Sequence, residues 1–186
     1  MTDTQPSDIE MTAVSEEELR GYEAKINAFR EKVLAGKESA RLELTAHEIN
    51  ALINNSEGLK SLKGRVQVRI GNDSIGGKIS IPLDEFSPAM KGRYLNGDGS
   101  FILSCQNGIP LIQIQTLSVK GKPVPEQFLA ALKEENLAAN LVNKPETARI
   151  LQRIKSVRIE GGKLILETTP EPEPAQSSAA PANAEP

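Results

Sequence analysis

Two side chains in the sequence are of the types that most often carry catalysis or bind metal ions, and each type occurs once: His47 and Cys105. A catalytic cysteine needs a base near it, and a zinc site needs several ligands at fixed spacing. His47 follows Thr45, the expected N-cap of a helix, so we expect it to be exposed in the first turn. Cys105 falls in a strand pattern with no histidine near it in sequence, which is typical of a small core residue. We therefore expect no enzyme activity, no metal and no cofactor.

Other chemical signals are equally weak. The run Asn96-Gly97-Asp98-Gly99 lacks the spaced acidic ligands and the terminal glutamate of a calcium loop. The chain has 25 acidic and 22 basic residues mixed along its length, no tryptophan and few other aromatic residues, so we expect no nucleic-acid binding. No apolar run approaches the roughly 18 to 20 residues that cross a bilayer, so we expect no membrane span in this chain.

Composition divides the 186 residues into three parts. Residues 1–14 contain few large apolar side chains, and residues 169–186 are mostly Pro, Ala, Glu and Ser. Segments of this kind bury too little surface to offset the entropy lost on ordering, so we expect a disordered N-terminal arm and a disordered tail. Residues 15–168 are enough for a single domain with its own core.

The clearest structural signal is a change in the phase of the apolar residues around Asn107-Gly108. Phe101 and Leu103 stand at odd positions before this pair, whereas Ile112 and Ile114 stand at even positions after it. In a two-residue type I′ hairpin, facing residues have position numbers with a constant sum and point to the same side of the sheet. The change of phase therefore predicts a hairpin in which Phe101 faces Ile114 and Leu103 faces Ile112.

Two further turns, at residues 71–74 and 161–162, bring apolar residues onto a shared face in the same way. The expected facing pairs are Ile70 with Ile75, Val66 with Ile79, Ile159 with Leu164, and Val157 with Leu166. Beyond Ile114 the apolar residues return to odd positions, opposite a stretch that contains glycines. This second change predicts a β-bulge or a strong bend near residues 115–117.

Helices are expected in four places. Capping-box patterns open one helix over residues 15–36 and another at Thr45, and further helices begin around Pro125 and after Lys144-Pro145. The order of elements is then helix, helix, four strands, two helices and two strands. We therefore predict an α+β fold, in which a curled antiparallel sheet of about six strands has helices covering one face.

Several short runs carry a resemblance to a known group of proteins. They read LTAHEINALI at residues 44–53, ISIPL at 79–83, GRYLNG at 92–97 and VKGKPVP at 119–125. Together they resemble a group of uncharacterised bacterial domains, opening with L-T-x-x-E-[IL]-N-A-L, that usually lie just outside a single N-terminal membrane-spanning helix. The likeness covers about residues 14–168. It implies a sheet curled about a helix, similar in outline to tubular lipid-binding proteins, and it brings no established activity.

The resemblance also bears on location. It implies an extracytoplasmic module tethered to a membrane, but no hydrophobic anchor stands ahead of Ser15 in the printed sequence. The location therefore stays open: extracytoplasmic and membrane-tethered if the start is truncated, and cytoplasmic otherwise.

Within the first of these runs, Asn50 and Asn54 stand one helical turn apart. Their side-chain amides can both donate and accept hydrogen bonds, and so can hold neighbouring backbone. We favour this structural role, in which they pin the connection to a strand, over contact with a ligand.

Two function classes remain for such a chain. In the first, Phe101, Leu103, Ile112 and Ile114 line an aliphatic groove that binds a lipid or another apolar small molecule. In the second, the same residues are packed core, and the chain is a structural or protein-interaction module with a protein partner. Both are non-enzymatic, and the resemblance associates both with the cell envelope.

Overall fold

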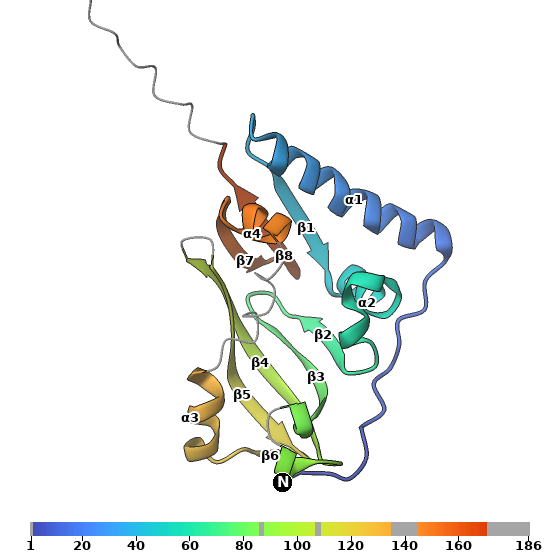
Figure 1. Cartoon of the computed structure of the whole chain (residues 1–186), viewed down its shortest axis with the longest axis vertical. Coiled ribbons are helices and arrows are strands. Elements are labelled where there is room, and N and C mark those ends of the chain that lie inside the picture. Colours follow the sequence, from blue (N-terminus) through green and yellow to red (C-terminus); the bar gives the residue numbers. More distant parts are fainter. Residues whose placement is uncertain (1, 86–87, 107–108, 135–144, 171–186) are drawn as a thin grey trace, which may run out of the picture.

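The computed structural model describes residues 2–85, 88–106, 109–134 and 145–170 (Figure 1). Its elements in chain order are α1 (Glu16–Ala35), β1 (Arg41–Thr45), α2 (Ala46–Asn55), the 3-10 helix η1 (Glu57–Leu62), β2 (Val66–Ile70), β3 (Ile75–Pro82), the 3-10 turns η2 (Leu83–Glu85) and η3 (Pro88–Met90), β4 (Tyr94–Gln106), β5 (Ile109–Val119), β6 (Lys122–Pro123), α3 (Glu126–Glu134), α4 (Pro145–Leu151), β7 (Ile154–Glu160) and β8 (Lys163–Thr168). The protein is therefore α+β, as predicted.

The strands form two antiparallel sheets. The large sheet has the order β2-β3-β4-β5-β6, and the small sheet has the order β1-β8-β7. The prediction of one curled sheet of about six strands is thus not met, because the described residues contain eight strands divided between two sheets. The pattern analysis omitted β1 and β6. β1 pairs with β8 from the other end of the chain, so no local turn signals the pairing.

The predicted hairpins are confirmed. The observed pairs are Phe101 with Ile114, Leu103 with Ile112, Ile70 with Ile75, Val66 with Ile79, Ile159 with Leu164, and Val157 with Leu166. Gly161 and Gly162 have φ values of 58° and 74°, the positive angles that a type I′ turn requires at both central residues. The turn at residues 107–108 lies outside the described residues, but pairing resumes directly on either side of it, between Gln106 and Ile109.

The predicted bulge is also confirmed. Ser100 pairs with Thr116, whereas the next residue, Phe101, pairs with Ile114. Gln115 is thus the extra residue of β5, and it resets the phase of the apolar side chains. The result is that Leu117 and Ile114, although an odd number of positions apart, belong to the same buried cluster.

The helices begin where the sequence predicts. The Ser15 and Thr45 side chains each accept a hydrogen bond from a backbone N–H in the first turn of α1 and α2, respectively. In both helices the carboxylate of a glutamate three positions later accepts a hydrogen bond from the backbone N–H of the cap residue, which completes the capping box. α1 ends at Gly36, whose φ of 74° suits a residue without a side chain.

Buried apolar side chains form two clusters. The first joins α1 to the small sheet and contains Phe29, Val33, Ala40, Leu42 and Leu44. The second joins α3 to the large sheet and contains Ile79, Ile114, Leu117 and Leu129. Each sheet thus packs against a helix of its own.

The N-terminal segment differs from the expectation of a disordered arm. Residues 2–14 run in an extended path from the end of the large sheet near β6 to the start of α1 (Figure 1). Ile9 is only 5% exposed, and hydrogen bonds join Asp3 to Tyr94 and Ser7 to Asn96. Composition missed this order because polar backbone contacts, rather than apolar burial, fix most of the segment. The predicted disordered tail lies outside the described residues from position 171 onward.

Asn50 holds the outer edge of β2. Its Nδ2 donates to the backbone carbonyl of Val68, and its Oδ1 accepts from the Val68 N–H, both at 2.7 Å. Asn50 is 7% exposed, so these groups have little access to water. The amide side chain therefore takes the place of a neighbouring strand. The expected structural role is confirmed for Asn50, although it holds β2 itself rather than the connection to it; Asn54 is also buried, but its Oδ1 has no hydrogen-bond partner among the described residues.

Replacing Asn50 tests this role. Asn50→Ala leaves a backbone donor and acceptor of Val68 without partners, and should lower the free energy of unfolding by about 1–3 kcal/mol, measured by denaturant titration. Asn55→Ala is the matched control, because Asn55 is exposed and its side chain bonds only to Ala51 of its own helix. It should change stability by about 0.5 kcal/mol or less. Equal losses in the two variants would contradict the role of Asn50.

Candidate functional site

The four residues predicted to line a ligand groove lie together on one face of the β4–β5 hairpin. Ile114 is 3% exposed and belongs to the buried cluster with Leu129 of α3, and Phe101 packs against that cluster. Leu103 and Ile112 are half-buried and lie further toward the end of the hairpin. Neither of the two cavities described below and in the last section has any of the four among its lining residues.

The two residues considered for chemistry, His47 and Cys105, lie in separate parts of the fold. His47 is exposed, as expected, and its ring meets the ring of Tyr22 edge-on at a centroid distance of 6.2 Å. Cys105 is half-buried, with its Sγ 3.7 Å from the carbonyl oxygen of Leu151. Within the described residues, no cluster of three or more His, Cys, Asp or Glu side chains could hold a metal ion.

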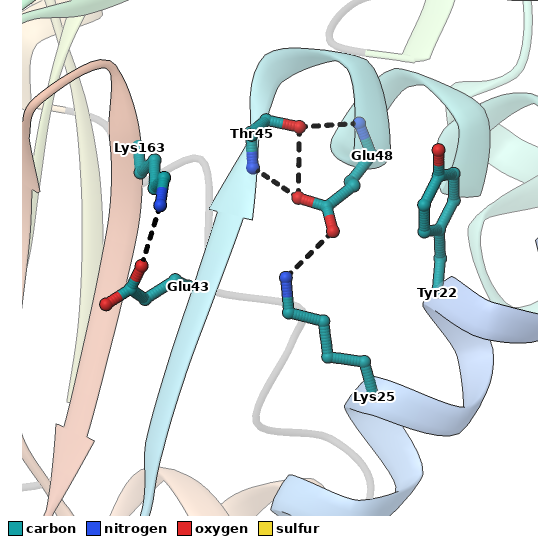
Figure 2. A pocket seen from close by; sticks show the side chains of 6 residues that line it. All are labelled: Tyr22, Lys25, Glu43, Thr45, Glu48 and Lys163. Carbon is teal, nitrogen blue, oxygen red and sulfur yellow. Dashed lines mark hydrogen bonds and ion pairs between the residues drawn. The ribbon is translucent and has the colours of Figure 1, made fainter. Parts of the chain in front are cut away.

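A polar cavity of about 330 Å³ lies where α1 approaches β1 and α2 (Figure 2). Its lining residues are Tyr22, Lys25, Glu43, Thr45, Glu48 and Lys163. They come from α1, β1, α2 and β8, so segments far apart in the sequence meet here. Figure 2 shows two ion pairs on its walls, one from Lys25 to Glu48 and one from Lys163 to Glu43.

Glu48 has both carboxylate oxygens occupied. Oε2 accepts from the backbone N–H and the hydroxyl of Thr45 at 2.7 and 3.0 Å, and Oε1 accepts from Lys25 Nζ at 2.8 Å. Partial burial pushes the pKa of Glu48 upward, but the bonds from Lys25 and Thr45 outweigh it, so its pKa lies below the ordinary value. Glu48 is thus a structural anion that caps α2 and ties it to α1.

Glu43 is held in a similar way. Its carboxylate accepts from Lys163 at 3.0 Å and from two nitrogens of Arg41 at 2.7 and 2.9 Å. The bond from Lys163 and then that from Arg41 lower the pKa of Glu43. With both glutamates engaged, what remains to the cavity are the further N–H groups of the two lysine ammonium groups and the hydroxyl of Tyr22. The two lysines and the two glutamates of the lining are paired one to one, so their charges cancel.

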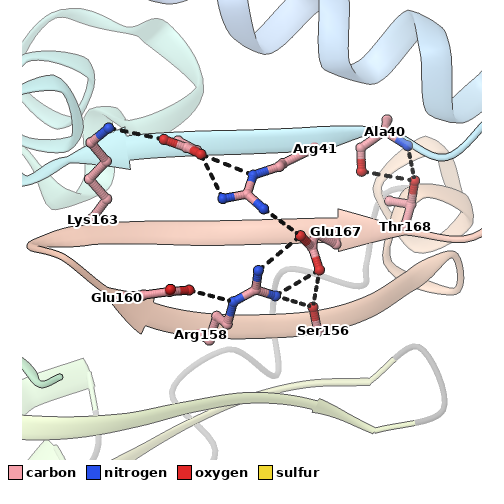
Figure 3. A network of polar contacts seen from close by, with 9 residues as sticks. Ala40, Arg41, Ser156, Arg158, Glu160, Lys163, Glu167 and Thr168 are labelled. Atoms are coloured by element: carbon pink, nitrogen blue, oxygen red, sulfur yellow. Dashed lines mark hydrogen bonds and ion pairs between the residues drawn. The ribbon is translucent and has the colours of Figure 1, made fainter.

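A charged network on one face of the small sheet shares Glu43 and Lys163 with the lining of the cavity (Figure 3). At its centre Arg158 binds Glu167 through two parallel bonds of 2.7 and 2.9 Å, and Arg41 binds the same carboxylate at 2.8 Å. The hydrogen bonds from Arg158, followed by the bond from Ser156 and the charges of the two arginines, lower the pKa of Glu167 to about 2. The bonds to Glu167 and then to Glu160 raise the pKa of Arg158 in turn. The network is a set of cross-strand ion pairs that fixes the register of the small sheet.

Pattern reasoning did not find the polar cavity or the network. Both depend on β1. The alternation of Arg41 and Glu43 with the buried Leu42 and Leu44 is the pattern in the sequence that could have predicted this strand. The sequence does show the Thr45 to Glu48 capping box, but it cannot show that Lys25 and Lys163 lie beside it.

Comparisons with known proteins add no relative. No family model, curated protein or solved structure matches the chain. The fold and the site therefore define only a class, an α+β protein with two antiparallel sheets and a polar surface cavity. Over the part of the chain that the structure describes, no helix has the length and apolar character needed to cross a membrane.

The Glu167 network predicts a specific acid sensitivity. Because the folded-state pKa of Glu167, about 2, lies below its ordinary value of 4.5, its contribution to stability is complete above about pH 4.5 and is lost as the pH falls toward 2. Glu167→Gln should therefore flatten the dependence of the melting temperature on pH across that window. Arg158→Met should flatten it in the same way, because Arg158 is the largest cause of the shift. Wild-type slopes in both variants would show that the pairing does not stabilise the fold.

Proposed function

We propose that this protein is a non-enzymatic module that recognises a partner protein through its surface and has a packed interior. The observation that carries the proposal is the position of Ile114. Its side chain is 3% exposed and is packed with Ile79, Leu117 and Leu129, so the most central of the four groove candidates has neighbours on all sides. The glutamates of the polar cavity support the proposal as well, because both are committed to structural bonds.

A location in the cell envelope is part of the proposal and rests on the resemblance of residues 44–53 and the other short runs to envelope domains. Fractionation of cells that express the chain from its native gene tests this part separately.

An apolar ligand is the second candidate function. It is favoured by the partial exposure of Leu103 and Ile112, which face each other beyond the buried cluster and could contact an acyl chain. Native mass spectrometry and organic extraction of protein purified from its own host distinguish the two functions. We expect the mass of the polypeptide alone, whereas a lipid or other apolar molecule in a 1:1 ratio would overturn the packed interior.

Two isoleucines on opposite faces of the same hairpin provide a direct test of packing. Ile114→Ala should lower the free energy of unfolding by about 2–5 kcal/mol, because it opens a cavity in a filled cluster. Ile102→Ala removes the same atoms from a side chain that is 48% exposed, and should cost about 1 kcal/mol or less. A small loss for Ile114→Ala would mean that its side chain lines open space, and would favour the ligand groove.

A further inference from the structure

The first residues of the chain occupy an open strand edge. Tyr94 begins β4, but β5 pairs with β4 only from Asp98 onward, so the backbone of Tyr94 on that side has no partner in β5. Asp3 fills the place. Its N–H donates to the Tyr94 carbonyl at 2.9 Å and its carbonyl accepts from the Tyr94 N–H at 2.8 Å, as in an antiparallel bridge.

Asn96 binds the next residues of the segment through their backbone. Its Nδ2 donates to the carbonyl of Gln5 at 2.9 Å, and its Oδ1 accepts from the N–H of Ser7 at 3.0 Å. The hydroxyl of Ser80, a residue only 1% exposed, donates to the same Oδ1 at 2.8 Å and lies 3.1 Å from the Ser7 nitrogen. Ser80 and Asn96 are thus built to hold an extended backbone, whatever side chains it carries.

Charge adds one side-chain preference. The Asp3 carboxylate pairs with Lys120 Nζ at 2.6 Å and accepts from Asn96 Nδ2 at 3.1 Å. The bond from Lys120 and then that from Asn96 lower the pKa of Asp3, because both contacts favour the ionised carboxylate. An acidic residue is therefore favoured at this position of the bound segment.

The segment does not fill the surface on which it lies. A cavity of about 390 Å³ remains between Pro6 and the sheet, lined also by Arg65, Ser80, Asp84 and Tyr94. Thr4, Gln5 and Pro6 are exposed, and Ile9 is the buried apolar side chain of the segment. The segment is thus held by a few backbone bonds and one apolar contact, with space left for a larger side chain at position 6.

We propose that this groove on β3 and β4 is a binding site for an extended acidic peptide of a partner protein, and that residues 3–9 of the chain occupy it in cis as an incomplete ligand. The inference rests on the proposed interaction function and names its site. A tethered segment acts at an effective concentration in the millimolar range, so a partner peptide must compete with it. A partner peptide that also fills the cavity beside Pro6 gains contacts that the tethered segment does not make.

The tether can be cut after folding, so that the intact chain forms first. A site-specific protease sequence inserted between Glu10 and Met11, both exposed, allows this cut. The probe is a fluorescent synthetic peptide with the sequence of residues 1–10, followed by fluorescence anisotropy. We expect saturable 1:1 binding to the cut protein, and binding at least about tenfold weaker to the uncut chain. No saturable binding to the cut protein would overturn the proposal.

Changes in the peptide alone separate recognition from folding of the protein. Methylation of the Ser7 nitrogen removes the donor to Asn96 and should weaken binding at least about tenfold, whereas Gln5→Ala keeps the backbone and should bind within about twofold of the parent. Pro6→Tyr should bind several-fold more tightly than Pro6→Ala, because its ring can enter the cavity. Unchanged affinity on methylation, or equal affinity of the two position-6 peptides, would overturn the proposal.

Two other outcomes are distinguishable. A dimer of the uncut chain that dissociates on cutting would mean that the groove takes the segment of a second copy, and would overturn the assignment to a different partner. A 1:1 lipid complex found together with normal peptide binding would overturn the packed interior of the proposed function and leave the groove in place. If the peptide fails to bind to cut protein that carries no lipid, the groove is overturned and the packed interior of the proposed function stands.

Discussion

Extended backbone leaves N–H and C=O groups without partners where no strand lies beside it, and this protein satisfies such groups with asparagine side chains at two places. Asn50 pairs with both groups of Val68 and thereby fixes α2 against β2. Asn96 pairs with Gln5 and Ser7 and thereby fixes the N-terminal segment against β4. An unpaired buried backbone group costs about as much as a lost hydrogen bond, so each amide positions a whole element. At β2 the amide stands in for a neighbouring strand, whereas at β4 it holds the segment whose Asp3 backbone pairs with Tyr94.

The small sheet depends on a different interaction. Its polar face alternates cations with carboxylates, so that Glu167 lies between Arg41 and Arg158, and Glu43 lies between Arg41 and Lys163. Exposed pairs of this kind contribute little singly, and a network of them mainly disfavours other strand registers. The opposite face carries Leu42 and the other apolar residues that pack on α1, so one register satisfies both faces together.

The sequence predicted contacts between residues that are close along the chain, and it missed contacts between residues that are far apart along it. Hairpins join residues close in sequence, and the phase of Phe101 and Ile114 around a tight turn is enough to define their pairing. The pairing of β1 with β8 has no such local record, and neither do the polar cavity and the charged network that depend on it. The N-terminal segment was missed for another reason. Apolar composition measures core burial, whereas residues 3–7 are held by backbone hydrogen bonds and by the ion pair of Asp3 with Lys120, which apolar composition does not record.

The hairpin around Ile114 and the N-terminal segment differ in how easily each can detach from the rest of the molecule. The hairpin around Ile114 is held by dense apolar packing, and its opening requires the loss of that packing. The N-terminal segment leaves a cavity beneath Pro6 and buries only Ile9, so its release exposes little apolar surface. A binding site occupied by such a segment can be vacated without unfolding the sheet that forms it. A rigid sheet with a weakly held strand-like ligand at its edge is the arrangement that recognition of an extended partner peptide requires.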